Sequence, residues 1–239
     1  MSEKIPNIDF HSHIIPRADH GCKSSSECRA QLAMMREVGT DIAVATPHFY
    51  PHLHNVSEFS ENVNAALARL KQVGAEKAPL LCIGAEVLLC ENIDQLEGLS
   101  ELCVRGTKTL LLELPSDDMN PGHYKTVEAI LNSGYVVVLA HIDRYLKAHP
   151  EYVYPLLDMG ALAQINPFAL STFGPKKHIN QILADSESIV AIGSDLHGSK
   201  KGSLKDFSRL KKRLGEHYGN ILARSNDLLS GAEMIDLTK

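Results

Sequence analysis

The sequence predicts one α/β domain built on a mainly parallel sheet, with the size of an α/β barrel. Short apolar, β-branched segments alternate with longer amphipathic segments along the whole chain, which is the pattern of parallel strands joined by crossover helices. The 239 residues suit a single barrel of this type. No repeat, low-complexity tract or linker-like stretch divides the chain, so we expect residues 1–239 to form one domain.

The hydrophobic pattern also places the individual elements. Strands are expected at 7–12, 41–46, 80–88, 109–114, 135–141, 162–166 and 189–194. Helices are expected at 24–38, 57–73, 122–133, 151–159, 177–186, 204–215 and 226–234. In a parallel barrel, the loops that follow the carboxyl ends of the strands form the mouth that carries the chemistry.

Charge and composition narrow the range of functions. The formal net charge is −5 and the isoelectric point is near 6.2, so the chain lacks the basic footprint of a nucleic-acid-binding protein. A basic run within 200–213 is the local exception, and we interpret its helical part as a solvated helix face.

The cysteines and the N-terminus indicate a cytoplasmic protein. Five cysteines without a C-x-x-C pair argue against a disulfide framework and against a thiolate zinc site. The first residues lack the apolar core of a signal peptide, and no apolar stretch approaches the roughly 18 residues of a membrane span. We therefore expect a soluble protein without membrane insertion. An oligomer is compatible with the sequence, because no feature fixes the oligomeric state.

Polar residues stand at the carboxyl end of every predicted strand. They are His11, His13, His48, Glu86, Glu113, His141 with Arg144, Asn166, and Asp195 with His197. A single histidine at such a place is usually structural, but several histidines at one level beside embedded acids favour a metal site. Glu113 in particular lies in an apolar run, where a buried carboxylate is costly unless it is paired or bound to a cation.

The spacing of these residues suits more than one metal ion. Residues i and i+2 of a strand point the same way, so His11 and His13 can offer two imidazoles to one face, and Asp195 and His197 repeat the arrangement. Nine donors exceed what one ion binds, so we expect two or three ions, with Glu86 as the bridging carboxylate. Imidazole and carboxylate ligands without thiolate suit Mn²⁺, Fe²⁺ or Zn²⁺.

Closely spaced divalent ions indicate hydrolysis of phosphate esters. Such ions acidify a bridging water, orient a phosphoryl group and stabilise charge on the attacking and leaving oxygens. Arg144 would lie near the mouth, where its guanidinium fork suits a phosphate. Alternatively, Arg144 forms a surface ion pair with Asp143 or another acid.

Seven short motifs follow one another along nearly the whole chain. They are Asp9-Phe10-His11-Ser12-His13-Ile14-Ile15-Pro16, Thr46-Pro47-His48, Gly84-Ala85-Glu86, Leu112-Glu113-Leu114, Ala140-His141-Ile142-Asp143-Arg144-Tyr145, Gln164-Ile165-Asn166 and Ser194-Asp195-Leu196-His197. In this order they resemble the polymerase and histidinol phosphatase (PHP) superfamily. Within it, they resemble the bacterial manganese-dependent tyrosine-protein phosphatases of capsule and exopolysaccharide operons.

The resemblance implies a distorted seven-stranded, TIM-barrel-like PHP barrel that binds three metal ions. The first ion would take His11, His13, Glu86 and Asp195, and the second would take Glu86, Glu113 and His141. The third would take a loop residue together with His48 and His197. A metal-bound hydroxide would then attack phosphotyrosine while Arg144 holds the phosphate.

Two departures from the family pattern affect the site. The family commonly has an Asp-Asp-Gly loop where this chain has Asp19-His20-Gly21, so His20 would take the place of the third-site carboxylate. Asp19 is the alternative ligand or a proton donor. Family members often carry a second phosphate-binding arginine after the residue that matches His197, where this chain offers Lys200 or Lys201.

Three functions remain open from the sequence. The first is dephosphorylation of phosphotyrosine on protein, for which the resemblance points to the tail of a membrane tyrosine autokinase. The second is hydrolysis of a small phosphomonoester, as in histidinol phosphatases. The third is a non-catalytic PHP module, which the nearly complete set of ligands makes the least favoured.

Overall fold

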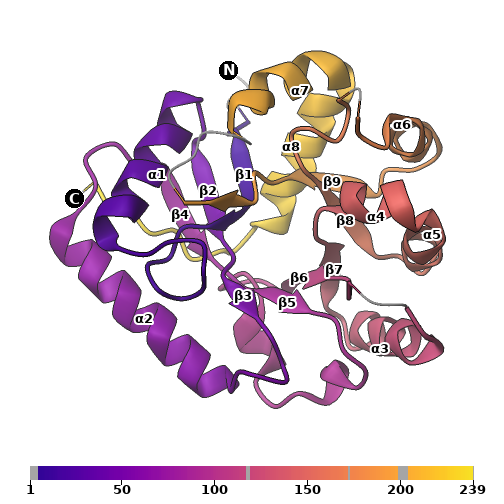
Figure 1. The fold of residues 1–239 in the computed structure, drawn as a ribbon, viewed down its shortest axis with the longest axis horizontal. Coiled ribbons are helices and arrows are strands. Elements are labelled where there is room, and N and C mark those ends of the chain that lie inside the picture. Colours follow the sequence, from indigo (N-terminus) through magenta and orange to yellow (C-terminus); the bar gives the residue numbers. More distant parts are fainter. Residues whose placement is uncertain (1–4, 117–118, 172, 199–203, 239) are drawn as a thin grey trace.

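The computed structural model describes residues 5–116, 119–171, 173–198 and 204–238. Its strands lie at the centre and its helices around them (Figure 1). One sheet has the order β10 (Leu196–His197), β1 (Ile8–His13), β2 (Ile42–Ala45) and β4 (Leu80–Ile83). The other has the order β3 (His48–Phe49), β5 (Glu86–Leu88), β6 (Thr109–Glu113), β7 (Val136–Leu139), β8 (Leu162–Ile165) and β9 (Ile189–Ile192).

All neighbouring strands within these two sheets are parallel, which confirms the predicted α/β class. The hydrogen-bonded strands form two sheets in the described part of the chain. A continuously closed seven-stranded barrel therefore stays a prediction.

The break between the sheets runs through two neighbouring chain segments at the same level. β2 and β3 are separated by Thr46 and Pro47, and β4 and β5 are separated by Gly84 and Ala85. Pro47 has no N–H to donate, and the N–H of Ala85 donates to the carbonyl of Leu102 rather than to a strand. The prediction of one strand over 80–88 is therefore wrong. This shared break sets His48 and Glu86 side by side as paired residues that open β3 and β5.

Polar side chains cap the first three of the described α-helices. The helices are α1 (Ser25–Glu37), α2 (Val56–Val73), α3 (Pro121–Asn132), α4 (Ile142–Ala148), α5 (Pro150–Asp158), α6 (Lys176–Asp185), α7 (Phe207–Leu214) and α8 (Glu216–Leu228), with 3-10 turns η1 (Ile93–Gln95), η2 (Leu99–Leu102) and η3 (Leu204–Asp206). Ser24, Asn55 and Asn120 each accept a backbone N–H in the first turn of the helix that follows.

The last two helical predictions and one omission need correction. The expected helix over 204–215 is η3 followed by α7. The expected helix over 226–234 is wrong: α8 starts ten residues earlier, and the chain turns at Gly231 (φ 85°). The sequence reading also missed α4, whose seven residues are too few to show a clear helical period.

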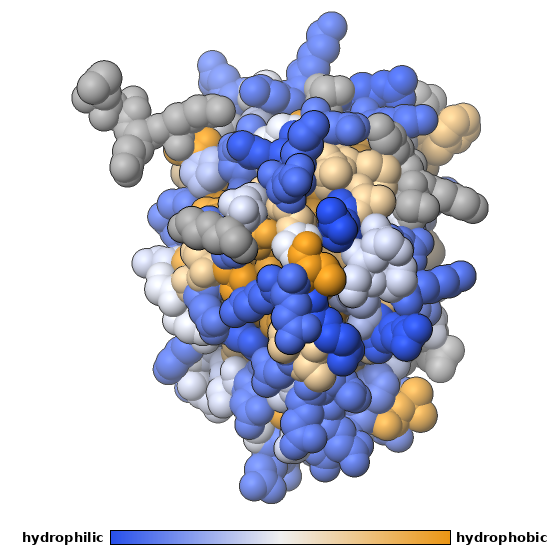
Figure 2. Space-filling view, turned by 90° about the vertical axis from the view of Figure 1, so that its left-hand side faces the viewer, coloured by the Kyte–Doolittle hydropathy of each residue, from blue (hydrophilic) through white to orange (hydrophobic). Residues whose placement is uncertain are grey.

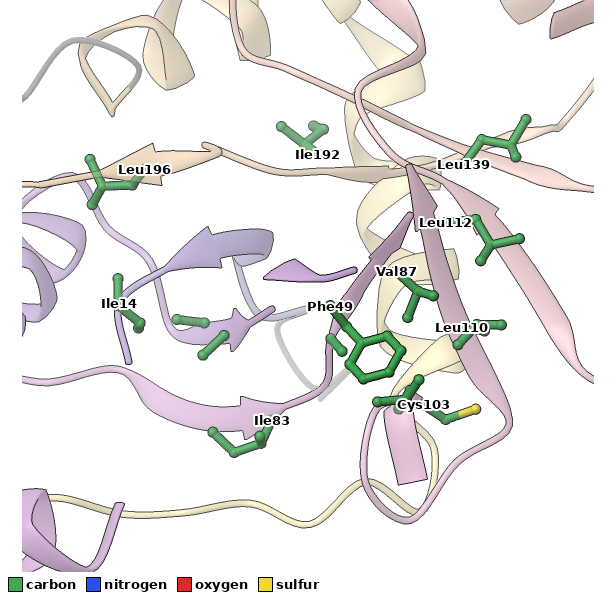
Figure 3. Close-up of a cluster of buried hydrophobic side chains, with 14 of the residues drawn as sticks. Ile14, Phe49, Ile83, Val87, Cys103, Leu110, Leu112, Leu139, Ile192 and Leu196 are labelled. Atoms are coloured by element: carbon green, nitrogen blue, oxygen red, sulfur yellow. The ribbon is translucent and has the colours of Figure 1, made fainter. Parts of the chain in front are cut away.

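The core joins both sheets. One cluster of buried residues contains Ile83 and Leu196 from the four-stranded sheet together with Val87, Leu112 and Leu139 from the six-stranded sheet (Figure 3). A second cluster, with Phe10 and Leu111, also contains residues of both sheets. The cysteines are free, and all except the partly exposed Cys90 are buried.

The surface is mainly polar where Figure 2 shows it, with smaller apolar areas between hydrophilic residues. Among the described helices, none combines the length and the apolarity that crossing a membrane requires.

Candidate metal centre

The polar residues at the strand ends converge in space. Their nitrogen and oxygen atoms form four overlapping groups in which the contributing atoms lie within 4.8 Å of one another. The groups are His13, His48 and His197; His11, His13 and Asp195; His11, Glu86 and His141; and His48, Glu86 and Glu113. Eight of the nine metal ligands predicted from the sequence are thus brought together.

Glu86 lies at the centre of this cluster. Its side chain is fully buried, and its Oε2 lies 3.2 Å from Nε2 of both His11 and His13. The same oxygen lies 2.9 Å from Nδ1 of His48, while Oε1 lies 2.8 Å from Nε2 of His141. One carboxylate therefore faces four imidazoles, from β1, from β3 and from His141, which lies two residues after the end of β7.

The charge state of Glu86 follows from these neighbours. Burial alone would raise its pKa, but the imidazoles of His11, His13 and His141 lower the pKa of Glu86 well below its usual value. Asp195 behaves in the same way, since His13 and His197 lower its pKa against the opposing effect of burial. Both carboxylates are ionised, as cation ligands must be.

Glu113 differs from these two acids. Burial, together with the negative charge of Glu86, raises the pKa of Glu113 to about 7. Its Oε2 lies 3.7 Å from Nδ1 of His48, and its Oε1 lies 3.7 Å from Nε2 of His141. A second negative charge beside Glu86 is therefore unfavourable unless a cation lies between them.

The unpartnered atoms of the cluster fit divalent cations. Oε2 of Glu86, Oδ1 of Asp195 and Nδ1 of His48 are buried without a hydrogen bond. Nδ1 of His48 faces Oε2 of Glu86 at 2.9 Å without hydrogen-bond geometry. Buried polar atoms without partners are costly. Imidazole nitrogens and carboxylate oxygens are the donor set that Mn²⁺, Fe²⁺ and Zn²⁺ accept, so the cluster can hold metal.

Backbone strain coincides with two of the cluster residues. His141 has φ 31° and Asp195 has φ 51°, both in the left-handed region that residues other than glycine rarely adopt. Such strain gathers at functional sites, where surrounding contacts hold it in place.

Comparison with known proteins shows the family to which this chain belongs. The model of the family "Capsular polysaccharide synthesis, CpsB/CapC" matches residues 7–229. The chain belongs to the CpsB/CapC family. The tyrosine-protein phosphatase CpsB of Streptococcus pneumoniae is 28% identical over 202 residues, which cover 80% of this chain and 82% of that protein. The tyrosine-protein phosphatase YwqE of Bacillus subtilis is 26% identical over 236 residues, with coverage of 93% and 91%.

A solved structure supports the fold. The structure described as YwqE from Bacillus subtilis and CpsB from Streptococcus pneumoniae, metal-dependent tyrosine phosphatases, superimposes with a TM-score of 0.73. It covers 95% of this chain and 96% of the other, at 23% identity. This CpsB/CapC chain therefore shares the fold of that structure along nearly its whole length.

The loop after β1 places Asp19 and His20 differently. Oδ2 of Asp19 lies 2.6 Å from Nδ1 of His13 and accepts the N–H of His48 at 3.0 Å, while Oδ1 accepts the N–H of Gly21 at 2.8 Å. Against the effect of burial, these contacts lower the pKa of Asp19 below its usual value. The exposed His20 ring lies 5.0 Å from the ring of His48 and 4.8 Å from that of His197.

Arg144 lies at the rim of the cluster. Its side chain is 48% exposed, and its guanidinium forms an ion pair with Asp195 and approaches Nε2 of His141 at 3.4 Å. Arg144 therefore pairs with Asp195, an acid of the cluster, and not with Asp143. Lys200 and Lys201, the other predicted phosphate contacts, lie outside the described residues.

Three buried polar residues beside the cluster were not identified from the sequence as functional. Asp9 accepts the N–H of Ser194 at 2.7 Å, Asp143 accepts the N–H of Asn166 at 2.8 Å, and Gln164 contacts His11 and His141. Burial raises the pKa of both Asp9 and Asp143 to about 6. All three lie in the quoted sequence motifs, which was the available signal, but only the packed structure reveals their partners.

Proposed function

We propose that this chain is a single-domain, metal-dependent phosphomonoesterase that removes phosphate from tyrosine on protein. The observation that carries the proposal is the cluster of four imidazoles around the buried carboxylate of Glu86. Relatives that align over at least four fifths of the chain are named tyrosine-protein phosphatases, which supports the substrate class.

The family resemblance implies three overlapping ligand sets, and short distances within two of them support it. His11, His13, Glu86 and Asp195 would hold one ion, and Glu86, Glu113 and His141 a second. His48 and His197 would hold a third together with His20, because Asp19 is already bonded to His13. Manganese is the proposed metal, with iron or zinc as chemically suitable replacements, and a closed seven-stranded PHP barrel is the proposed frame.

The residues of the chain have distinct tasks in this reaction. When bound, the ions supply an acidified water and neutralise phosphate charge. Glu86 and Asp195, both ionised, hold positive charge at the centre of the mouth. Asp19 orients His13 through Nδ1 and is ionised, which favours a positioning role over proton donation.

Arg144 is the proposed phosphate-binding residue. Half of its side chain is exposed, and its guanidinium reaches the cluster from the rim. A phosphate bound beside the cluster would give the guanidinium of Arg144 a second anion to bind, in addition to Asp195. Lys200 and Lys201 would add positive charge, without the bidentate geometry of an arginine.

The proposed partner is the phosphotyrosine tail of a membrane tyrosine autokinase in the cytoplasm. Membership of the capsular polysaccharide synthesis family CpsB/CapC supports this proposal. A small phosphomonoester is the competing substrate, because the same cluster serves any phosphate ester.

A substrate panel tests the proposal. Protein loaded with Mn²⁺ is expected to hydrolyse p-nitrophenyl phosphate and phosphotyrosine peptides, and to lose this activity with a chelator. A much higher kcat/KM for a soluble metabolite phosphate than for the peptides would replace the proposed substrate class. Loaded protein that leaves all these esters intact would refute the enzyme assignment.

A further inference from the structure

Gln164 is a fully buried amide on β8 that contacts two cluster residues at once. Its Oε1 lies 3.1 Å from Nδ1 of His11 and accepts the backbone N–H of His141 at 2.7 Å. A single oxygen therefore connects β8 both to β1 and to His141, which lies just before α4.

The orientation of the amide is fixed by backbone groups. The N–H of His141 can only donate, so it requires the oxygen of Gln164 on its side. The carbonyl of Gly193 can only accept, so it requires the Nε2 group, which lies 3.3 Å away. Nε2 also donates to Oδ1 of Asn166 at 3.1 Å.

This orientation determines the tautomer of His11. Since Oε1 of Gln164 is an acceptor, Nδ1 of His11 must carry the proton. Nε2 is then the ring nitrogen of His11 that faces Oε2 of Glu86, at 3.2 Å, and the rest of the cluster. The same oxygen holds the backbone N–H of His141, the residue at φ 31°.

We infer that Gln164 is a positioning residue of the metal centre, which sets the ring nitrogen that His11 offers to the ions and holds His141 in its strained conformation. The inference rests on the proposed metal centre. Polar groups that orient metal-bound histidines typically affect metal affinity about 10- to 100-fold.

The test compares two substitutions and a control. Gln164→Met keeps the volume but removes the acceptor. Gln164→Glu keeps the acceptor toward His11 and His141, and in its protonated form its second oxygen can donate to the carbonyl of Gly193 as Nε2 does. Ser225→Ala removes another buried hydrogen bond, to the carbonyl of Val190, from α8 outside the cluster.

Two measurements are made on each protein. The first is Zn²⁺ affinity by calorimetry. The second is the ¹⁵N–¹H correlation spectrum of labelled histidines in the diamagnetic Zn²⁺-loaded protein. Wild type should show His11 ligated through Nε2, with an Nδ1 proton protected from solvent exchange.

Gln164→Met should lower Zn²⁺ affinity about 10- to 100-fold and lose protection of the His11 proton. Gln164→Glu should stay within about threefold of wild type, because the acceptor remains, and Ser225→Ala should bind like wild type. Ligation of wild-type His11 through Nδ1 would overturn the inference. This test needs no variant, so it remains decisive even if Gln164→Met does not fold. An equal loss in Gln164→Glu and Gln164→Met would also overturn it.

The same data separate this inference from the proposed function. Zn²⁺ binding by wild type with unchanged binding by Gln164→Met refutes the role of Gln164 alone. Wild type that binds no divalent metal refutes both.

Discussion

A glutamate at the centre of the cluster and a glutamate toward its rim have pKa values shifted in opposite directions. Glu86 at the centre is fully buried, while the Glu113 side chain toward the rim is 17% exposed. Burial opposes ionisation of both, yet the pKa of Glu86 is far below its usual value and the pKa of Glu113 is raised to about 7. The difference comes from neighbouring charges. Four imidazole nitrogens lie within 3.2 Å of Glu86, whereas Glu113 is 3.7 Å from the nearest imidazole nitrogens and is repelled by the charge of Glu86. Because both carboxylates are largely buried, it is the neighbouring charges that decide which of them is ionised and able to bind a cation.

The largest effect is expected from the centre. Glu86→Gln should abolish metal loading and lower kcat/KM toward p-nitrophenyl phosphate at least about 100-fold. The reason is that both ligand sets that include Glu86 lose its negative charge. The metal-free variant should remain folded by circular dichroism. Wild-type metal content in this variant would contradict the bridging role.

Glu113 should affect the stability of the metal-free protein in a pH-dependent way. Its folded-state pKa is raised from 4.5 to about 7, so its contribution to stability is present below about pH 4.5 and lost as pH rises through about 7. Glu113→Gln imitates the protonated form. At about pH 8 it should raise the free energy of unfolding by about 1–3 kcal/mol, and this gain should shrink toward zero at about pH 5.

Urea titrations in chelator measure this difference. Glu97→Gln, at an exposed glutamate outside the cluster, is the matched control and should show no such trend. A Glu113→Gln gain that is equal at both pH values would contradict the raised pKa.

Arg144 at the exposed rim should matter for substrate and not for metal. Arg144→Lys keeps the charge but loses the fork, so kcat/KM for aryl phosphates should fall about tenfold, the cost of one charged hydrogen bond. Metal content, measured by plasma emission spectroscopy, should be unchanged. A lower metal content would instead assign Arg144 to the stability of the centre through Asp195.

His20 should give the smallest effect. His20→Ala should weaken binding of the third metal ion by about tenfold or less. The His20 ring is exposed and does not belong to the four groups of closely spaced ligand atoms. His52→Ala, an exposed histidine on the loop after β3, should bind metal like wild type. Equal affinities of the two variants for the third metal ion would show that His20 is not one of its ligands.

The candidate site was more predictable than the secondary structure around it. His11, His13, Glu86 and Asp195 stand at strand ends in apolar surroundings, so residue type and position both marked them. The strand over 80–88 was mistaken because its apolar pattern continues through Gly84 and Ala85, whereas the break depends on Pro47 of the neighbouring segment and on the carbonyl of Leu102. Local sequence does not contain such partners.

By itself, the sequence determined that this chain is a parallel α/β protein with histidines and acids gathered at one end of its strands. Hydrophobic period and residue chemistry are local properties, so they can be read without coordinates. Only the tertiary structure decided that Glu86 is surrounded by imidazoles, that Asp19 bonds His13 and that Gln164 bonds His11. Hydrogen bonds and charge interactions depend on distances of a few ångströms between residues far apart in the chain, and folding alone sets those distances.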